Sequence, residues 1–177
     1  MPDELKVDGK VIRLTVGFIT DLPEVDAIVY YARTDLTLGS GFGTAISAQG
    51  GPKIQEELKK IGGANVTDVV VTGGGNLPAR HILHAVGPRF QEEDGEAKLR
   101  TTVVHALQKA ESLQLRKTAF PAMGAGFYGI PLDQCARVTL GAVEEFLQTA
   151  VELREVLFCL RDSRELKAFQ KQLQGMT

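Results

Sequence analysis

Residues 118–131 read TAFPAMGAGFYGIP, an apolar run followed by a glycine-rich loop. The run TAFPA predicts a buried strand, and a helical pattern starts at Leu132, directly after the loop. Glycine has no Cβ atom, so several backbone N–H groups can turn inward together, and the N-terminus of the next helix adds partial positive charge. We therefore expect an anion site, suited to a phosphate or diphosphate, at the carboxyl end of this strand.

A second loop of the same kind lies earlier in the chain, at residues 38–45 (LGSGFGTA). It follows the apolar run DAIVYY at residues 26–31 and precedes the helical start TAIS. Either loop alone is equally consistent with glycines that only ease a tight turn, and neither continues into the Gly-Lys-Ser/Thr of a P-loop. The spacing GxGxxG occurs in the later loop, but without a following βαβ unit and ribose-binding acid, so a nicotinamide cofactor is not expected.

Apolar runs alternate with helical patterns along the chain, which is typical of a layered α/β fold. The sequence contains no internal repeat and no linker rich in Pro, Gly or Ser, so residues 1–177 are expected to form a single domain. Helices are expected from residue 52, over 96–113 and 132–149, and from residue 162. The strands of one six-stranded sheet are expected over residues 10–16, 26–31, 66–72, 81–86, 118–122 and 155–160.

The composition is that of a folded domain in water, with 44% hydrophobic and 24% charged residues. A formal net charge of −2 gives no basic surface for nucleic acid, so a nucleic-acid partner is not expected. The chain begins without a signal peptide and has no apolar run of about 18 residues, which predicts a cytoplasmic location and no membrane partner. Cys135 and Cys159 lie in apolar sequence and are expected to be reduced core thiols, and no His, Cys or Asp cluster predicts a metal site or cofactor.

The order of these segments resembles that of a macrodomain. VDAIV at 25–29 is followed by a glycine loop, then by TGGGNLPARHILHAVGP at 72–88 and FPAMGAGFYGIP at 120–131. The last two blocks match the family's usual T-G-x-LPA-x-x-IHAVGP and FPA-x-x-TG-x-YG-x-P almost residue for residue. The resemblance, to the ADP-ribose-binding or Appr-1-p processing family, implies a three-layer α/β/α fold with a mixed six-stranded sheet. It also implies an ADP-ribose cleft at the crest of the sheet, with ADP-ribose or an ADP-ribosylated protein as partner.

Both glycine loops are implied to hold the ligand. The resemblance places Phe127 over the distal ribose, and it assigns the remaining loop positions to the diphosphate and this ribose. Ser40 stands where the family has a middle glycine, and Phe42 where it has valine, which adds bulk where the backbone approaches the ligand. The ligand-binding residues implied are Gly39, Ser40, Gly41 and Phe42 on one side, and Gly124, Ala125, Gly126, Phe127, Tyr128 and Gly129 on the other.

The adenine side of the implied cleft departs from the family. The family's GDIT is GFIT here, at residues 17–20, so Phe18 replaces the aspartate that accepts a hydrogen bond from the adenine amino group. Loss of such a partner costs about 1.5–3 kcal/mol when the bond is to a charged group. Phe18 either stacks on a purine or packs into the core. With Ile19, it marks the implied adenine side, and Asp21 is a candidate displaced substitute for the missing acid.

The residues that handle water in hydrolytic macrodomains are also replaced. VNAAN is written VYYAR at residues 29–33, so Arg33 stands where the family's asparagine holds the distal ribose and the attacking water. The acidic residue that follows the glycine loop in the best-known hydrolases is Gly43 here. Arg33 either pairs with a ligand phosphate or is a solvated loop arginine. Gln55-Glu56-Glu57 resembles the QEE of glycohydrolase-type members but reads as the exposed face of a helix.

These observations predict a divergent macrodomain that binds ADP-ribose or a related nucleoside diphosphate, with little or no hydrolysis. One alternative is an enzyme that removes ADP-ribose from proteins or deacetylates O-acetyl-ADP-ribose, with the water held by substrate phosphate and backbone. Another is a degenerate domain that binds protein or RNA through Tyr30, Tyr31 and Phe42. The three histidines are expected to be structural: His81 and His84 in a strand, and His105 on a helix surface.

Overall fold

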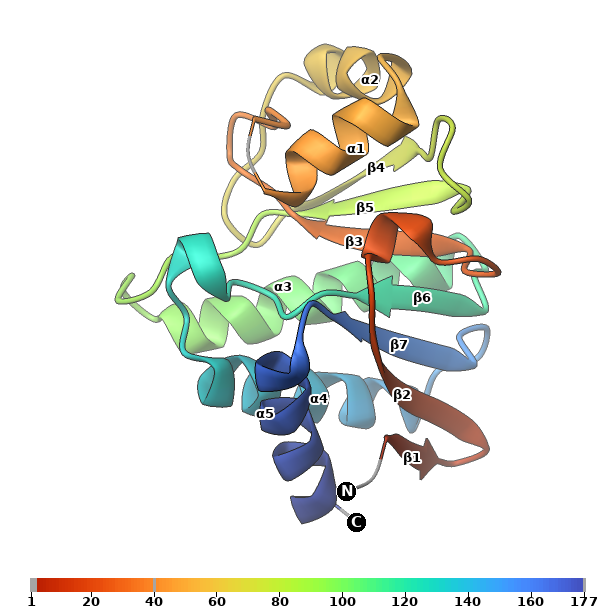
Figure 1. The fold of residues 1–177 in the computed structure, drawn as a ribbon, viewed down its shortest axis with the longest axis vertical. Helices are drawn as coiled ribbons and strands as arrows, with labels where there is room; N and C mark the ends of the chain where they lie inside the picture. Colours follow the sequence, from red (N-terminus) through yellow and green to blue (C-terminus); the bar gives the residue numbers. More distant parts are fainter. Residues whose placement is uncertain (1–2, 40, 177) are drawn as a thin grey trace.

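The computed structural model describes residues 3–39 and 41–176, and it contains one mixed sheet of seven strands (Figure 1). The strands lie in the order β1-β2-β7-β6-β3-β5-β4. The pairs β1/β2 and β4/β5 are antiparallel, whereas β2, β7, β6, β3 and β5 run parallel to one another. The strands are β1 Glu4–Val7, β2 Lys10–Val16, β3 Ala27–Tyr31, β4 Val69–Gly73, β5 His81–Ala85, β6 Lys117–Phe120 and β7 Glu155–Leu160.

The six strands predicted from the sequence are present, but the number was wrong because β1 was missed. This strand has only four residues, three of them exposed or half-buried, so it carries little apolar signal. It forms a hairpin with β2 through Asp8 and Gly9, whose φ angles are 47° and 80°. Asp-Gly between two short runs is the sequence of a two-residue hairpin turn, and this was the signal that could have revealed β1.

Two layers of helices cover the sheet, which confirms the α/β/α architecture (Figure 1). Side chains of α3, α4 and α5 pack on one face in a large core that includes Val29 and Phe158. On the other face, α1, α2 and the short 3-10 turn η1 pack over Ile28 and Ala119. The helical elements are α1 Phe42–Gly50, α2 Lys53–Ile61, α3 Gly95–Ser112, α4 Leu132–Leu147 and α5 Ser163–Gly175, with 3-10 turns η1 Ile19–Asp21 and η2 Gly126–Tyr128.

The alternation along β3 sends two neighbouring tyrosines to opposite sides of the sheet. Tyr30 packs with α1 and α2, whereas Tyr31 packs with α3 and α4. Successive side chains of a strand point to opposite faces, so this placement follows from the strand itself. All five residues of β3 are buried, as expected of a central strand covered on both sides.

The parallel strands end at the same edge of the sheet, and the glycine loops begin there. One loop connects β3 to α1 and the other connects β6 to α4, while short turns follow β2 and β7. The turn after β7 starts α5 with the N-cap half of the predicted capping box, because Asp162 Oδ1 accepts a hydrogen bond from Glu165 N at 2.9 Å. The Glu165 carboxylate accepts from Arg161 N at 2.8 Å, one residue before the N-cap. Four connections therefore converge at one edge, the position where open α/β sheets bind ligands.

Candidate ligand-binding cleft

The two glycine loops face each other across a cleft of about 140 Å³ at this edge. Gly41 and Phe42 come from the loop after β3, whereas Gly124, Ala125 and Tyr128 come from the loop after β6. Thus the structure brings together five of the residues proposed for the diphosphate and distal ribose. Ser40 lies outside the described residues, and the side chain of Phe127 is not described. The lining residues are Tyr30, Tyr31, Gly41, Phe42, Pro121, Ala122, Gly124, Ala125, Tyr128, Arg161 and Glu165.

The loop after β6 requires glycine at its turns. Gly124, Gly126 and Gly129 have φ angles of 81°, 74° and 78°, which residues with a Cβ atom rarely adopt. A Cβ atom on Gly124 would also lie only 2.3 Å from Ile130 Cδ1. Two backbone bonds close the loop, from Ile130 N to Gly124 O and from Gly129 N to Gly126 O, each 3.0 Å. The loop is therefore a fixed backbone cradle beside the cleft.

The opposing loop enters α1 through Gly41, whose φ angle is 56°. A Cβ atom at Gly41 would meet no other atom within 4 Å, so this backbone is open to an approaching group. Phe42, the first residue of α1, is partly buried and lies in the wall of the cleft. Backbone at the start of a helix next to open space is a suitable surface for an anion.

The Tyr30 hydroxyl fills the space beside Gly43 that a side chain at position 43 would need. A Cβ atom built on Gly43 would lie 2.5 Å from the Tyr30 hydroxyl oxygen and 3.1 Å from two backbone atoms of Leu38. A carboxylate at position 43 therefore has no room while Tyr30 keeps this position. Burial raises the pKa of Tyr30 to about 12, so its hydroxyl is neutral at physiological pH and does not serve as a base.

The Arg33 side chain is already paired. Its Nη2 lies 3.1 Å from Asp35 Oδ2, and its Nε lies 3.3 Å from Asp35 Oδ1. Asp35 also accepts hydrogen bonds from Thr37 N and Thr37 Oγ1, at 3.0 and 2.8 Å. The backbone N–H of Thr37, followed by Arg33, lowers the pKa of Asp35 to about 2. Sequence reasoning overlooked Asp35, although it lies only two residues after Arg33.

Arg33 also lies outside the main cleft. It lines a second hollow of about 140 Å³ together with Gly87, Arg89 and Glu92. Tyr128 lines both hollows and stands between them, with Arg89 6.0 Å from its ring centroid. The structure therefore places Arg33 beside the main cleft and not among the residues that line it.

At the implied adenine side, the alternative that Phe18 packs into the core is wrong, because 72% of this residue is exposed. Ile19 is buried instead, and Asp21 is exposed at the end of η1. Gly17 N donates to Leu160 O at 2.9 Å, which places the residue after Gly17 beside the end of β7. Phe18 is therefore an exposed aromatic ring at the edge of the sheet that carries the cleft.

Sequence reasoning also overlooked Arg161, which follows β7 directly. Its Cζ lies 5.9 Å from the centroid of the Phe42 ring, a cation–π arrangement. Its Nη2 would be 3.9 Å from a Cβ atom on Gly126, in the opposite loop. Arg161 Nε lies 3.5 Å from an oxygen of the buried Glu165. The expected ligand site at strand ends was the signal that pointed to this position.

Several other candidates have structural contacts. Gln55 is not on a freely exposed face: it binds Leu38 N at 3.1 Å and Leu36 O at 3.4 Å, and so holds the first loop. Burial lowers the pKa of His84 to about 4, and its Nε2 lies 2.9 Å from Thr72 Oγ1. His105 is not a simple surface residue, because its Nδ1 lies 2.7 Å from Thr67 O. The positive φ of Thr67, 81°, also explains why β4 begins at residue 69 and not at residue 66.

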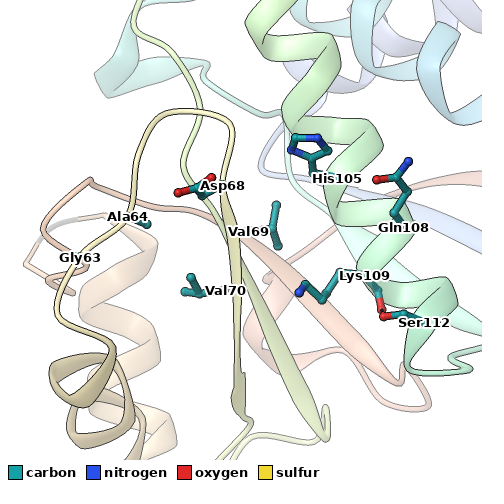
Figure 2. Close-up of a pocket in the computed structure, with 9 residues that line it drawn as sticks. All are labelled: Gly63, Ala64, Asp68, Val69, Val70, His105, Gln108, Lys109 and Ser112. Carbon is teal, nitrogen blue, oxygen red and sulfur yellow. Dashed lines mark hydrogen bonds between the residues drawn. The ribbon is translucent and has the colours of Figure 1, made fainter.

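A larger hollow, of about 380 Å³, lies away from these loops, between β4 and α3 (Figure 2). It contains none of the residues implied to bind a ligand. In the described part of the chain, no group of three or more His, Cys, Asp or Glu residues is placed to hold a metal ion. None of the described helices is long and apolar enough to cross a membrane.

The chain belongs to the macrodomain family: the model of the Macro domain matches residues 31–139, more than half of its length. It is 37% identical over 166 residues to a macro domain-containing protein of Caldanaerobacter subterraneus subsp. tengcongensis, covering 90% of this chain and 94% of that protein. A macro domain-containing protein of Cupriavidus necator is 35% identical, covering 94% of this chain and 99% of the relative.

Solved structures with the same fold contain ligands of the implied kind. A variant of the Oceanobacillus iheyensis macrodomain with ADPR superimposes with a TM-score of 0.93 at 25% identity, covering 98% of this chain and 97% of that one. A Trypanosoma brucei macrodomain in complex with ADP-ribose superimposes with a TM-score of 0.85 at 33% identity, covering 90% and 68%. These likenesses support ADP-ribose binding as the function associated with this fold.

Proposed function

We propose that this protein binds ADP-ribose, free or attached to a protein, in the cleft that Gly41 and Phe42 line on one side and Gly124, Ala125 and Tyr128 on the other, and hydrolyses it little or not at all. The observation that carries the proposal is the meeting of two backbone turns, at Gly41 and at Gly124 to Gly126, across one cleft. Such turns offer N–H groups to a diphosphate without a clash of side chains. ADP-ribose in the related macrodomains supports the same ligand here.

We expect little hydrolysis because of the residues at two positions. Arg33 replaces the expected asparagine and is held by Asp35, and Gly43 lacks both an acid and the room for one beside Tyr30. Attack on an anomeric carbon needs a group that positions or deprotonates water. Neither position supplies such a group, whereas binding needs only the backbone turns.

The cleft must open when it binds a ligand of this size. Its volume of about 140 Å³ is smaller than the ~300–1,000 Å³ usual for ligand pockets. The side chains that narrow it most readily are Phe42 and Arg161, which lie across it in contact with each other. We expect the backbone turns to stay fixed and these two side chains to move.

Isothermal titration calorimetry with ADP-ribose tests the binding. We expect saturable heat from the wild type and none from Gly126→Glu, because a glutamate there places a carboxylate in the cradle and strains the positive φ. Gly175→Glu is the matched control, since Gly175 is exposed at the end of α5 and a Cβ atom there meets nothing within 4 Å. No heat from the wild type at millimolar ADP-ribose contradicts the proposal.

A turnover assay separates the binder from the hydrolase. The protein is incubated with an ADP-ribosylated protein and, separately, with O-acetyl-ADP-ribose, and released ADP-ribose or acetate is measured. We expect release no faster than in buffer. Release that rises in proportion to the enzyme concentration contradicts the non-catalytic part of the proposal and supports hydrolysis with water held by substrate and backbone.

A further inference from the structure

Arg161 connects the two sides of the cleft. It lies in the turn between β7 and α5, outside both glycine loops, yet its guanidinium reaches each of them. On one side its Cζ stands 5.9 Å from the centroid of the Phe42 ring, and on the other its Nη2 faces Gly126. It is also the only positively charged side chain among the described residues that line this cleft.

Glu165 sets the direction of this arginine. Only 3% of Glu165 is exposed, and one of its oxygens accepts a hydrogen bond from the backbone N–H of Arg161 at 2.8 Å. The other oxygen lies 3.5 Å from Arg161 Nε, so the anchored side of the guanidinium is the Nε side. The Nη groups then point toward the cleft, and the side chain is about half exposed, at 51%.

The cation–π contact between Arg161 and the Phe42 ring is weak, so little stability is lost when Arg161 leaves it. A cation over an aromatic ring at an exposed site contributes little to stability. A phosphate oxygen between the two loops offers the guanidinium a planar, charge-assisted hydrogen bond, which is the stronger interaction. Exchange of the ring for the phosphate also clears the space that Phe42 and Arg161 now occupy.

We propose that Arg161 is the residue by which this cleft selects phosphate-bearing ligands: it leaves the Phe42 ring and binds a phosphate oxygen across from Gly126. Glu165 is the positioning residue that keeps the Nε side of Arg161 anchored during this exchange. The inference rests on the proposed function and adds that ligand charge, and not only backbone fit, decides affinity. A nucleoside diphosphate should therefore bind in preference to the uncharged nucleoside.

The test is calorimetry with ADP-ribose, ADP and adenosine at salt concentrations from 25 to 300 mM. Arg161→Met retains the aliphatic stem against Phe42 but removes the charge, and Arg161→Lys retains the charge without the planar fork. Arg164→Gln is the matched control, because Arg164 is an exposed arginine three residues away, in the first turn of α5. Thermal unfolding of each variant checks that it is folded.

We expect Arg161→Met to weaken ADP-ribose and ADP about tenfold or more, as for loss of a hydrogen bond between charged groups, and to flatten the salt dependence. Arg161→Lys should bind with intermediate affinity and keep the salt dependence, and Arg164→Gln should resemble the wild type. Adenosine should bind all four proteins equally weakly.

Two results have different meanings. If Arg161→Met binds ADP-ribose within twofold of the wild type with an unchanged salt slope, the role of Arg161 is overturned while the proposed function stands. Should Arg161→Met not fold, Arg161→Lys decides, and an affinity for ADP-ribose within twofold of the wild type overturns the role of Arg161. If the wild type binds neither ADP-ribose nor ADP, both the proposed function and this inference are overturned.

Discussion

Alanine at position 43 should destabilise the protein because its methyl group enters space that the Tyr30 hydroxyl occupies. The Cβ atom would lie 2.5 Å from this oxygen and 3.1 Å from two Leu38 backbone atoms, all closer than ordinary contact. Overpacking of this kind costs about 1–3 kcal/mol, whereas replacing glycine by alanine inside a helix gains about 1 kcal/mol. An approach of 2.5 Å is far inside contact distance, so the cost should lie in the upper part of this range. After the helix gain is subtracted, we expect Gly43→Ala to lower the free energy of unfolding by about 1–2 kcal/mol.

Tyr30→Phe should relieve part of this cost, because it removes the atom of closest approach but leaves the Leu38 backbone in place. A double-mutant cycle measured by urea denaturation should show a favourable coupling of about 1 kcal/mol between the two substitutions. Wild-type stability of Gly43→Ala, or purely additive effects, would refute the claim that Tyr30 fills this space. The same geometry predicts that Gly43→Asp alone does not create a hydrolase.

Three further predictions concern single side chains. His84 is buried, and burial lowers its pKa from the usual 6.5 to about 4. Between these values the unfolded chain binds more protons than the folded protein, so the free energy of unfolding should fall as pH drops from 6.5 to 4. An NMR titration midpoint of His84 near 6.5 would contradict this. Phe18→Ala should change the free energy of unfolding by less than about 0.5 kcal/mol, since the ring is exposed. It should weaken the affinity for ADP-ribose severalfold in calorimetry, because a stacking contact is lost. A large loss of stability would instead show that the ring is packed. Burial raises the pKa of Cys135 and raises that of Cys159 to about 11, so native protein should react with a thiol reagent only as fast as it unfolds, and rapid labelling at pH 8 would contradict the buried placement.

The elements of the fold that could be predicted were those with local signals. Buried parallel strands such as residues 26–31 are continuous apolar runs, and the two glycine loops follow the ends of strands, so both the architecture and the meeting place of the loops could be expected. The N-cap at Asp162 could be predicted for the same reason. The strand β1 was missed because its pairing depends on an Asp-Gly turn and not on apolar residues of its own.

The details of the cleft depend on contacts between residues that are distant in sequence. Tyr30 of β3 occupies the space that a side chain at position 43 of α1 would need. No local sequence pattern indicates a contact between these two positions. Arg161 reaches Phe42 only because β7 and β3 lie in one sheet with their ends at the same edge. Phe18 is exposed where an apolar residue is often buried, since η1 turns Ile19 inward instead.

The most direct test of ADP-ribose binding by the two backbone turns is a crystal structure of the protein with this ligand. We expect the diphosphate between the loops, with its oxygens within hydrogen-bonding distance of N–H groups near Gly41 and Gly126 and with Arg161 displaced from the Phe42 ring. Ligand density elsewhere on the surface, or an unchanged empty cleft at millimolar ADP-ribose, would contradict the account.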